Sequence, residues 1–278
     1  MRHLKVSAKD IGKGWHMKYQ GEVKIISRND INEEVFSIRV EKPYEMDVKP
    51  GQFFNLKTSK FKSPLLRRPI SVSDSNETEI EFTIKVVGEG TAQLCDLSVG
   101  DGLDIMGPLG NGYLHQNENE ILIIGGGIGI APVKGLALKL KRENPNIHIT
   151  TVLGFRDEPY DLEAFNSVSD KLFVVSETDE NYQIGYVTGP LDKIIKEQKH
   201  LIEMSYACGP TPMLKAITNQ FNQAKMPIQL LMEEKMACGI GACLVCTCKI
   251  KEGDFGYKHE RMCKEGPMFF GSEVIFDA

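Results

Sequence analysis

Hydrophobic and polar positions follow two different patterns along the chain. From about residue 18 to about residue 115, short segments alternate apolar with polar residues and are separated by turn residues. Such alternation is typical of strands that bury one face, and turns at this spacing favour an antiparallel barrel or sandwich. The segments are GEVKIISRN (21–29), EVFSIRVEK (34–42), GQFFNLK (51–57), IEFTIKVVG (80–88) and GDGLDIMGP (100–108). We therefore predict an all-β region.

The pattern changes after residue 116. ILIIGGG (121–127) is a continuous apolar run, typical of a strand buried on both faces, and it leads through glycines into a helical stretch at 131–144. Strands and helices then alternate, which predicts right-handed βαβ units and a parallel sheet. The further strands are expected at 147–155, 171–177, 204–209 and 228–233, and the further helices at 190–198 and 211–221.

The C-terminal segment has little periodicity and many glycines and cysteines. A bound centre explains its stability better than an apolar core of its own. The predicted fold is thus an antiparallel barrel, an α/β domain and a small cysteine-rich region. The boundaries are an N-terminal extension at 1–17, the barrel at 18–116, the α/β domain at 117–232 and the cysteine-rich region at 233–278.

Composition narrows the function classes. The 278 residues are 41% hydrophobic and 26% charged, with a formal net charge of −5, which argues against nucleic acid or an anionic membrane as partner. No stretch approaches the length of about 18 apolar residues that a membrane helix needs, and the first residues lack the apolar core of a secretory signal. We expect a cytoplasmic protein.

Four of the seven cysteines lie between positions 238 and 248. Cys238-x4-Cys243-x2-Cys246, followed by Cys263, is the plant-type ferredoxin pattern for a 2Fe-2S cluster. Four intervening residues can wrap round a compact inorganic core. The spacing therefore predicts that these four cysteines hold the cluster.

The residues around these cysteines also favour a 2Fe-2S cluster over zinc. Gly239 and Gly241 permit the positive φ angles that aim backbone N–H groups at sulfur. The alternative is structural zinc, which is usually held by two C-x2-C pairs, whereas this chain has one such pair. Cys248 has no place in the pattern and is predicted not to be a ligand.

Two motifs in the β region suit a flavin. LLRRPISVSD (65–74) places Arg68 at a strand, and VVGEGTAQL (86–94) places Gly90 and Thr91 where a short helix can begin. A flavin pyrophosphate needs a fixed guanidinium and N–H groups at a helix start. Each motif is weak alone, because Arg68 could be an ordinary solvated arginine and Gly88 with Gly90 could close a hairpin.

The α/β region has a glycine-rich turn, GGGIGIAPV (125–133), between a strand and a helix. It lacks the G-x-G-x-x-G fingerprint, because Ile130 stands where the third glycine belongs. The turn can still admit a nucleotide at the C-terminal edge of a parallel sheet. ACGPTPM (207–213) is in an equivalent position, so Cys208 either faces the same crevice or is a buried structural thiol.

Together, RPIS, GEGT, GGGIGIAP and CGPTPM, in this order, resemble the ferredoxin–NADP reductase superfamily, in which a Greek-key FAD-binding barrel precedes a nicotinamide-binding α/β domain. The C-terminal C-x4-C-x2-C…C region resembles that of the electron-transfer subunits of NAD-dependent dihydroorotate dehydrogenases. The resemblance covers nearly the whole chain from about residue 18, and residues 1–17 have no counterpart.

This resemblance implies site residues. Arg68 would bind the FAD phosphates, Ser71 would lie near the reactive flavin nitrogen, and Ile70 is aliphatic where many members of the superfamily have an aromatic residue. The implied FAD set is Arg68, Pro69, Ile70, Ser71, Thr83, Ile84, Lys85, Gly90 and Thr91. The implied NAD set is Gly126, Gly127, Gly129, Cys208, Gly209 and Pro210, and the implied cluster ligands are Cys238, Cys243, Cys246 and Cys263.

Acidic residues favour NAD over NADP. Related NADP enzymes bind the 2′-phosphate with serine and arginine after the corresponding strand, whereas this chain has SETDE (176–180). Glu177 and Asp179 would repel a phosphate and could bond ribose hydroxyls instead. Glu177 is therefore an expected NAD-binding residue.

The resemblance implies an oxidoreductase subunit without catalytic side chains. A catalytic subunit with FMN would oxidise dihydroorotate to orotate for pyrimidine biosynthesis, and electrons would pass through 2Fe-2S and FAD to NAD⁺, in an assembly of two copies of each chain. One alternative is a reductase subunit of the same fold that serves ferredoxin or another dehydrogenase. A remote alternative is a zinc-stabilised interaction protein.

Overall fold

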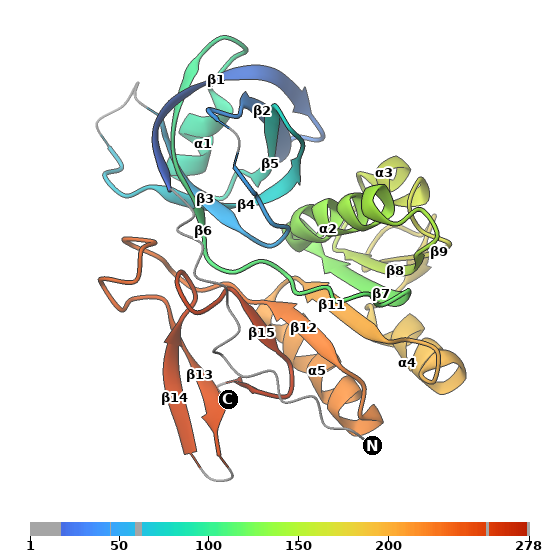
Figure 1. The fold of residues 1–278 in the computed structure, drawn as a ribbon. Coiled ribbons are helices and arrows are strands. Elements are labelled where there is room, and N and C mark those ends of the chain that lie inside the picture. Colours follow the sequence, from blue (N-terminus) through green and yellow to red (C-terminus); the bar gives the residue numbers. More distant parts are fainter. Residues whose placement is uncertain (1–17, 45, 59–62, 254–255, 277–278) are drawn as a thin grey trace.

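A closed antiparallel barrel forms the N-terminal domain (Figure 1). The computed structural model describes residues 18–44, 46–58, 63–253 and 256–276. The strand order is β1-β2-β5-β4-β3-β6, as expected of a Greek-key flavin barrel. Its elements are β1 (Tyr19–Asp30), β2 (Val35–Glu41), β3 (Phe53–Thr58), β4 (Arg68–Ser75), β5 (Glu79–Lys85), α1 (Glu89–Cys95) and β6 (Gly102–Leu109).

Alternation along the strands fills the barrel. On β5, Ile80, Phe82 and Ile84 are at most 1% exposed and point inward, whereas Glu81 and Thr83 face the second domain. Phe54 of β3 meets Phe82 edge to face, with 5.6 Å between ring centroids. Burying each such side chain contributes about 1.5–3 kcal/mol, so the period-two pattern fixes the strand register.

The second half forms a parallel sheet with helices on its faces, in the order β10-β9-β8-β7-β11-β12-β15. Because the chain runs from β7 outward in one direction and then returns to β11 on the other side, the strand order reverses between β7 and β11. Ligands of open α/β sheets bind at such a switch point. The elements are β7 (Glu120–Gly126), η1 (Gly127–Gly129), α2 (Ile130–Glu143), β8 (His148–Phe155), α3 (Leu162–Asn166), β9 (Lys171–Ser176), β10 (Gln183–Ile184), α4 (Thr188–Gln198), β11 (Met204–Cys208), α5 (Thr211–Ala224) and β12 (Ile228–Leu231).

The C-terminal segment is more regular than the sequence predicts. β13 (Thr247–Glu252), β14 (Gly256–Arg261) and β16 (Val274–Ile275) form a sheet, and β15 (Met268–Phe270) pairs antiparallel with β12 of the large sheet. Ile250, Phe269 and Val274 belong to the same apolar core as Leu230. The region therefore has no separate core but packs into the core of the large sheet, a contribution that its weak periodicity did not indicate. The predicted extension at 1–17 lies outside the described residues.

An ion cluster joins the barrel to α2. The Nζ of Lys134 lies 3.0 Å from Oε1 of Glu81 and 2.7 Å from Oδ2 of Asp161, and Lys134 is 7% exposed. Arg39 contacts the other oxygen of Glu81 at 2.5 Å, and the hydroxyl of Ser73 donates to Glu81 at 3.1 Å. The two domains are thus held together by paired charges as well as by apolar contacts.

A close backbone approach accompanies these ion pairs. A Cβ on Gly135 would lie 2.8 Å from the carbonyl oxygen of Ser73, so α2 rests directly on β4. At the next turns of α2, Arg142 reaches Asp74 at 2.8 Å.

No helix among the described residues is long and apolar enough to cross a membrane.

Candidate cofactor sites

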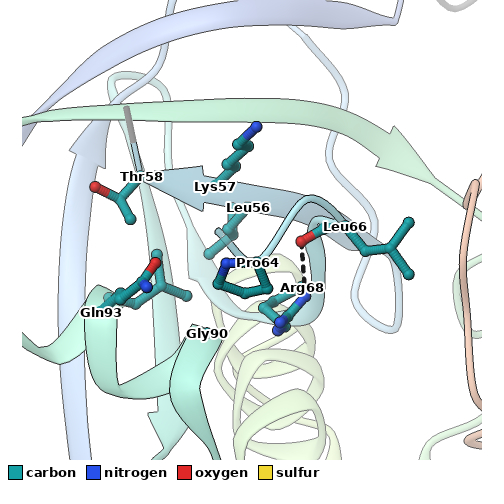
Figure 2. A pocket seen from close by; sticks show the side chains of 9 residues that line it. Leu56, Lys57, Thr58, Pro64, Leu66, Arg68, Gly90 and Gln93 are labelled. Atoms are coloured by element: carbon teal, nitrogen blue, oxygen red, sulfur yellow. Dashed lines mark hydrogen bonds between the residues drawn. The ribbon is translucent and has the colours of Figure 1, made fainter. Parts of the chain in front are cut away.

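Arg68 and Gly90 meet at the barrel surface and line a pocket (Figure 2). A Cβ on Gly90 would lie 2.1 Å from Nε of Arg68, so the guanidinium sits directly on the first turn of α1. Arg68 also donates to the carbonyl of Leu66 at 2.6 Å, which fixes its direction. A guanidinium beside the N–H groups of a helix start concentrates positive charge, and this arrangement fits the pyrophosphate of FAD.

Thr91 shapes the turn that begins α1. Its hydroxyl accepts hydrogen bonds from the N–H groups of Val87 (2.9 Å) and Gly88 (3.2 Å) and donates to the Gly88 carbonyl (3.0 Å). The side chain is therefore engaged within the turn. The backbone N–H groups of Gly90 and Thr91 are the part of this motif that can serve a phosphate.

The RPIS segment runs along β4 beside β3. Pro69 lies opposite Asn55, Ile70 opposite Phe54 and Ser71 opposite Phe53. Pro69, Ile70 and Ser71 are half-buried, and Ile70 packs partly against the barrel core. This strand therefore offers an apolar and hydroxyl-bearing surface next to Arg68, as the flavin assignment requires.

Three residues of β5, Thr83, Ile84 and Lys85, were expected to line the FAD, but their side chains do not share one face of the strand. Ile84 is in the barrel core, so its side chain does not face a cofactor, and Lys85 pairs with Glu34 at 3.0 Å. Thr83 is 3% exposed, and its hydroxyl has no hydrogen-bond partner among the described residues. A buried hydroxyl without a partner costs stability, so Thr83 fits a bound group that would supply one.

Two glycine turns meet at the switch point of the parallel sheet. Cys208 of β11 lies opposite Gly125 of β7, and a Cβ on Gly129 would lie 2.6 Å from the backbone carbon of Cys208. Gly127 has a φ of +53°, which favours glycine. The two glycine-containing segments therefore lie side by side at the C-terminal edge of the sheet.

The surroundings of Gly126 and Cys208 are closely packed. A Cβ on Gly126 would lie 2.3 Å from the sulfur of Met213 and 3.4 Å from Pro210, so a larger residue would have to displace the Met213 side chain. Burial, helped by the charge of Glu233, raises the pKa of the Cys208 thiol, which therefore stays neutral. Glu177 is exposed directly after β9, two strands away from β7.

The first two cysteines of the motif face one another across a tight turn. Gly239 and Gly241 have φ angles of +69° and +84°, as predicted, and the N–H of Cys243 donates to the sulfur of Cys238 at 3.4 Å. Burial raises the pKa of the Cys238 thiol, but hydrogen bonds from backbone N–H groups and from the Cys243 thiol outweigh it and lower the pKa to about 6. The turn thus favours an anionic sulfur.

The other two cysteines form a second pair. Cys246 and Cys263 are each 2% exposed, and their thiols are hydrogen-bonded to each other. Burial, together with the Cys246 thiol, raises the pKa of Cys263 to about 12. The charge of Cys238 also raises this pKa, to a smaller extent. Two thiol pairs suit a core of two irons with two ligands each, whereas a single zinc ion requires all four sulfurs at one point.

Cys248 behaves differently from these four. It lies on β13 opposite Glu260, is 9% exposed and packs in the apolar core. Burial and the carboxylates of Glu234 and Glu260 raise the pKa of its thiol to about 12. These surroundings suit a neutral structural thiol.

Two side chains near the cluster turn escaped sequence reasoning. Asn55 of β3 donates to the carbonyl of Cys238 at 3.3 Å, and Arg261 donates to the carbonyl of Gly241 at 2.8 Å. Arg261 lies two residues before Cys263, so its place in the sequence was a signal that it could contact the cluster turn. Asn55 is 183 residues away from Cys238, and no local pattern connects them.

Replacing Gly90 with alanine is expected to weaken FAD binding about 10- to 100-fold, because the new methyl group displaces the charged donor of the phosphate site. Arg68 has a flexible side chain and can move, so the fold should persist. Titration of the FAD-free protein with FAD measures the change. Gly88→Ala is the matched control, since a Cβ there meets nothing within 4 Å. Equal losses in both variants would contradict the assignment.

Comparison with known proteins identifies three domains. Residues 22–113 match the oxidoreductase FAD-binding domain, 123–219 match the oxidoreductase NAD-binding domain, and 233–275 match the iron–sulfur cluster binding domain of dihydroorotate dehydrogenase B. The chain therefore has FAD-binding, NAD-binding and iron–sulfur domains, and the zinc alternative is abandoned.

Relatives match almost the entire chain. The electron transfer subunit of dihydroorotate dehydrogenase B (NAD(+)) of Caldanaerobacter subterraneus subsp. tengcongensis is 37% identical over 94% of this chain and 100% of its own length, and that of Clostridium perfringens is 35% identical over 93% and 98%. A chain in the structure of an NADH-dependent reduced ferredoxin–NADP oxidoreductase is 31% identical, with a TM-score of 0.79 over 91% of this chain and 89% of that one. This chain belongs to the family of dihydroorotate dehydrogenase B electron transfer subunits.

Proposed function

We propose that this chain carries electrons from an FMN-containing catalytic subunit, which oxidises dihydroorotate to orotate, to NAD⁺. The observation that carries the proposal is the position of the cysteine turn, which rests on the flavin barrel through Asn55. The barrel in turn contacts the glycine turn of the nicotinamide domain through β5. Sites for a cluster, a flavin and a nicotinamide therefore follow one another through the molecule.

The bound groups supply the redox chemistry: nicotinamide exchanges two electrons together as a hydride, the cluster one, and flavin can do both. The chain's residues bind and orient these groups. Arg68 and the start of α1 would hold the pyrophosphate, and the turn at Gly239 would direct N–H groups at sulfur. Gly126 and Gly129 let the two glycine-containing segments pack closely at the edge where the nicotinamide nucleotide would bind. No side chain is required as acid or base.

An exposed apolar surface surrounds the cysteine turn. Ile240, Leu244 and Val245 are 50%, 61% and 52% exposed, and Cys243 beside them is exposed as well. We infer that the catalytic subunit docks here, because an electron donor must approach the cluster closely. Exposed apolar side chains next to a redox centre are typical of such contacts.

Reconstitution tests the proposed function. The chain, loaded with iron and FAD, is mixed with the FMN-containing dihydroorotate dehydrogenase chain of the same organism, and NADH formation from dihydroorotate is followed. We expect activity in the mixture and none with either chain alone. A mixture without activity would refute the dihydroorotate assignment. Light scattering of the complex tests the proposed assembly of two copies of each chain.

Leu244→Asn is expected to weaken binding of the catalytic subunit about tenfold, because an exposed apolar anchor is lost. Leu244 has a φ of +59°, a conformation that asparagine adopts more readily, so the turn itself should not suffer. Iron content should be unchanged, and affinity is measured by titration of the two chains. Leu201→Asn, at a 51% exposed position after α4, is the control. A docking surface elsewhere is indicated if the control loses as much affinity.

NAD rather than NADP is the proposed acceptor. Glu177 is exposed at the end of β9, and Asp179 accepts hydrogen bonds from the N–H and side-chain amide of Asn181 at 3.0 and 2.8 Å. Two carboxylates at this edge disfavour a 2′-phosphate. Comparison of the two nucleotides as acceptors of the reconstituted complex checks this preference.

The similarity to the ferredoxin–NADP oxidoreductase structure supports a second candidate, a reductase subunit that serves ferredoxin. Both candidates use the same three cofactors and differ in the partner. The curated relatives favour the dihydroorotate branch, because those named as its electron transfer subunits are 35–37% identical to this chain, against 31% for the ferredoxin–NADP oxidoreductase structure. Reduced ferredoxin, supplied in place of dihydroorotate in the reconstitution, distinguishes the candidates.

A further inference from the structure

Asn55 is a buried amide at the contact between the barrel and the cysteine turn. It is 2% exposed, and its Nδ2 donates to the carbonyl oxygen of Cys238 at 3.3 Å. Its neighbours on β3, Phe54 and Leu56, point into the barrel core. Alternation therefore directs Asn55 outward, toward the cluster region.

Gly239 follows Cys238 and packs against the same amide. A Cβ on Gly239 would lie 2.1 Å from Nδ2 of Asn55, and the glycine has a φ of +69°. Asn55 cannot move aside without losing its hydrogen bond, because it is buried. Side chain and turn are therefore complementary in shape as well as in polarity.

The backbone of Asn55 is fixed on the flavin side. Asn55 lies opposite Pro69 on β4, one pair from Arg68. The guanidinium of Arg67 approaches the Asn55 carbonyl at 3.5 Å and forms an ion pair with Asp104 at 2.6 Å. One residue thus contacts the cluster turn with its side chain while its backbone belongs to the strand beside the flavin site.

We propose that Asn55 is a positioning residue, which holds the first ligand turn of the cluster at a fixed place on the flavin-binding strands. Groups that orient metal ligands typically matter 10- to 100-fold for metal retention or activity. Asn55 acts on the backbone of a ligand residue, so its removal should both loosen the cluster and slow its reduction through FAD. This inference rests on the cluster site and not on the identity of the catalytic subunit.

The test uses the chain alone, loaded with FAD and iron. Asn55→Ala should release iron to a chelator about 10- to 100-fold faster. With NADH as reductant, flavin bleaching should be unchanged, whereas cluster bleaching should be slower about tenfold or more. Asn55→Asp keeps the size of the side chain but lacks the N–H donor to Cys238, so it should show the same changes as Asn55→Ala. Ser73→Ala, which removes another buried barrel hydrogen bond, should change neither cluster measurement.

A double-mutant comparison adds a second readout. Gly239→Ala alone should speed iron release, since its Cβ must displace Asn55. In the Asn55→Ala background the same change should cost less, because the space has been vacated. Unchanged iron release in Asn55→Ala, equal slowing of flavin and cluster bleaching, or strictly additive effects of the two substitutions would each overturn the proposal. None of these results depends on dihydroorotate or on a partner, so they are separate from a failed reconstitution.

Discussion

Lys134→Met is expected to lower the free energy of unfolding by about 3 kcal/mol. It removes the cation shared by buried Glu81, which keeps Arg39 as a partner, and by partly buried Asp161. The two carboxylates come from different domains, and their oxygens lie 3.0 and 2.7 Å from the ammonium group. NADH-dependent flavin reduction should also slow, since α2 begins at the glycine turn and rests on the barrel. Urea titration and stopped-flow bleaching measure the two effects.

Lys139→Met is the matched control on the same helix. Its side chain is 31% exposed and lies 3.7 Å from the exposed Glu143, so its loss should cost less than about 1 kcal/mol. Burial lowers the pKa of Lys134, but the charges of Glu81 and Asp161 outweigh it and raise the pKa above the ordinary value. The stabilisation is therefore fully present at neutral pH and is lost only as pH rises through that raised pKa. Equal costs for the two lysines would contradict this account.

Cys263→Ala is expected to abolish the 2Fe-2S absorption, because one iron loses a ligand from the buried pair with Cys246. Cys248→Ala should retain iron, although Cys248 is almost as buried, at 9% against 2% exposure. Iron content and the visible spectrum measure both outcomes. Reduction of FAD by NADH should persist in both variants, because the flavin and nicotinamide sites lie on other elements. If Cys248→Ala loses iron and Cys263→Ala retains it, Cys248 is the ligand and Cys263 the structural thiol, and the assignment is wrong.

Local patterns predicted the elements and the paired turns. The strand at 121–127 and the motif at 207–213 were expected in equivalent positions, because parallel strands align their carboxyl ends, and Gly129 indeed lies against Cys208. The cysteine spacing identified the metal motif, because ligands close in sequence must wrap one core.

Long-range contacts could not be predicted in this way. Lys134 looks like an ordinary helix lysine, and only the packing of α2 on the barrel buries it. Asn55 belongs to an alternating strand whose outward residues would otherwise be solvated. Most side chains of β14 are exposed, so its sequence has little hydrophobic periodicity and did not predict a strand. This strand is stabilised by backbone pairing with β13.

The pairing of β15 with β12 makes the cysteine-rich region inseparable from the nicotinamide domain. If the chain stopped at residue 232, the last strand of the large sheet would present unpaired N–H and C=O groups, and Leu230 would lose the cover of Phe269. Exposed apolar strand edges promote aggregation. A cluster-free reductase therefore cannot be obtained by trimming this sequence, and would require a redesigned sheet edge.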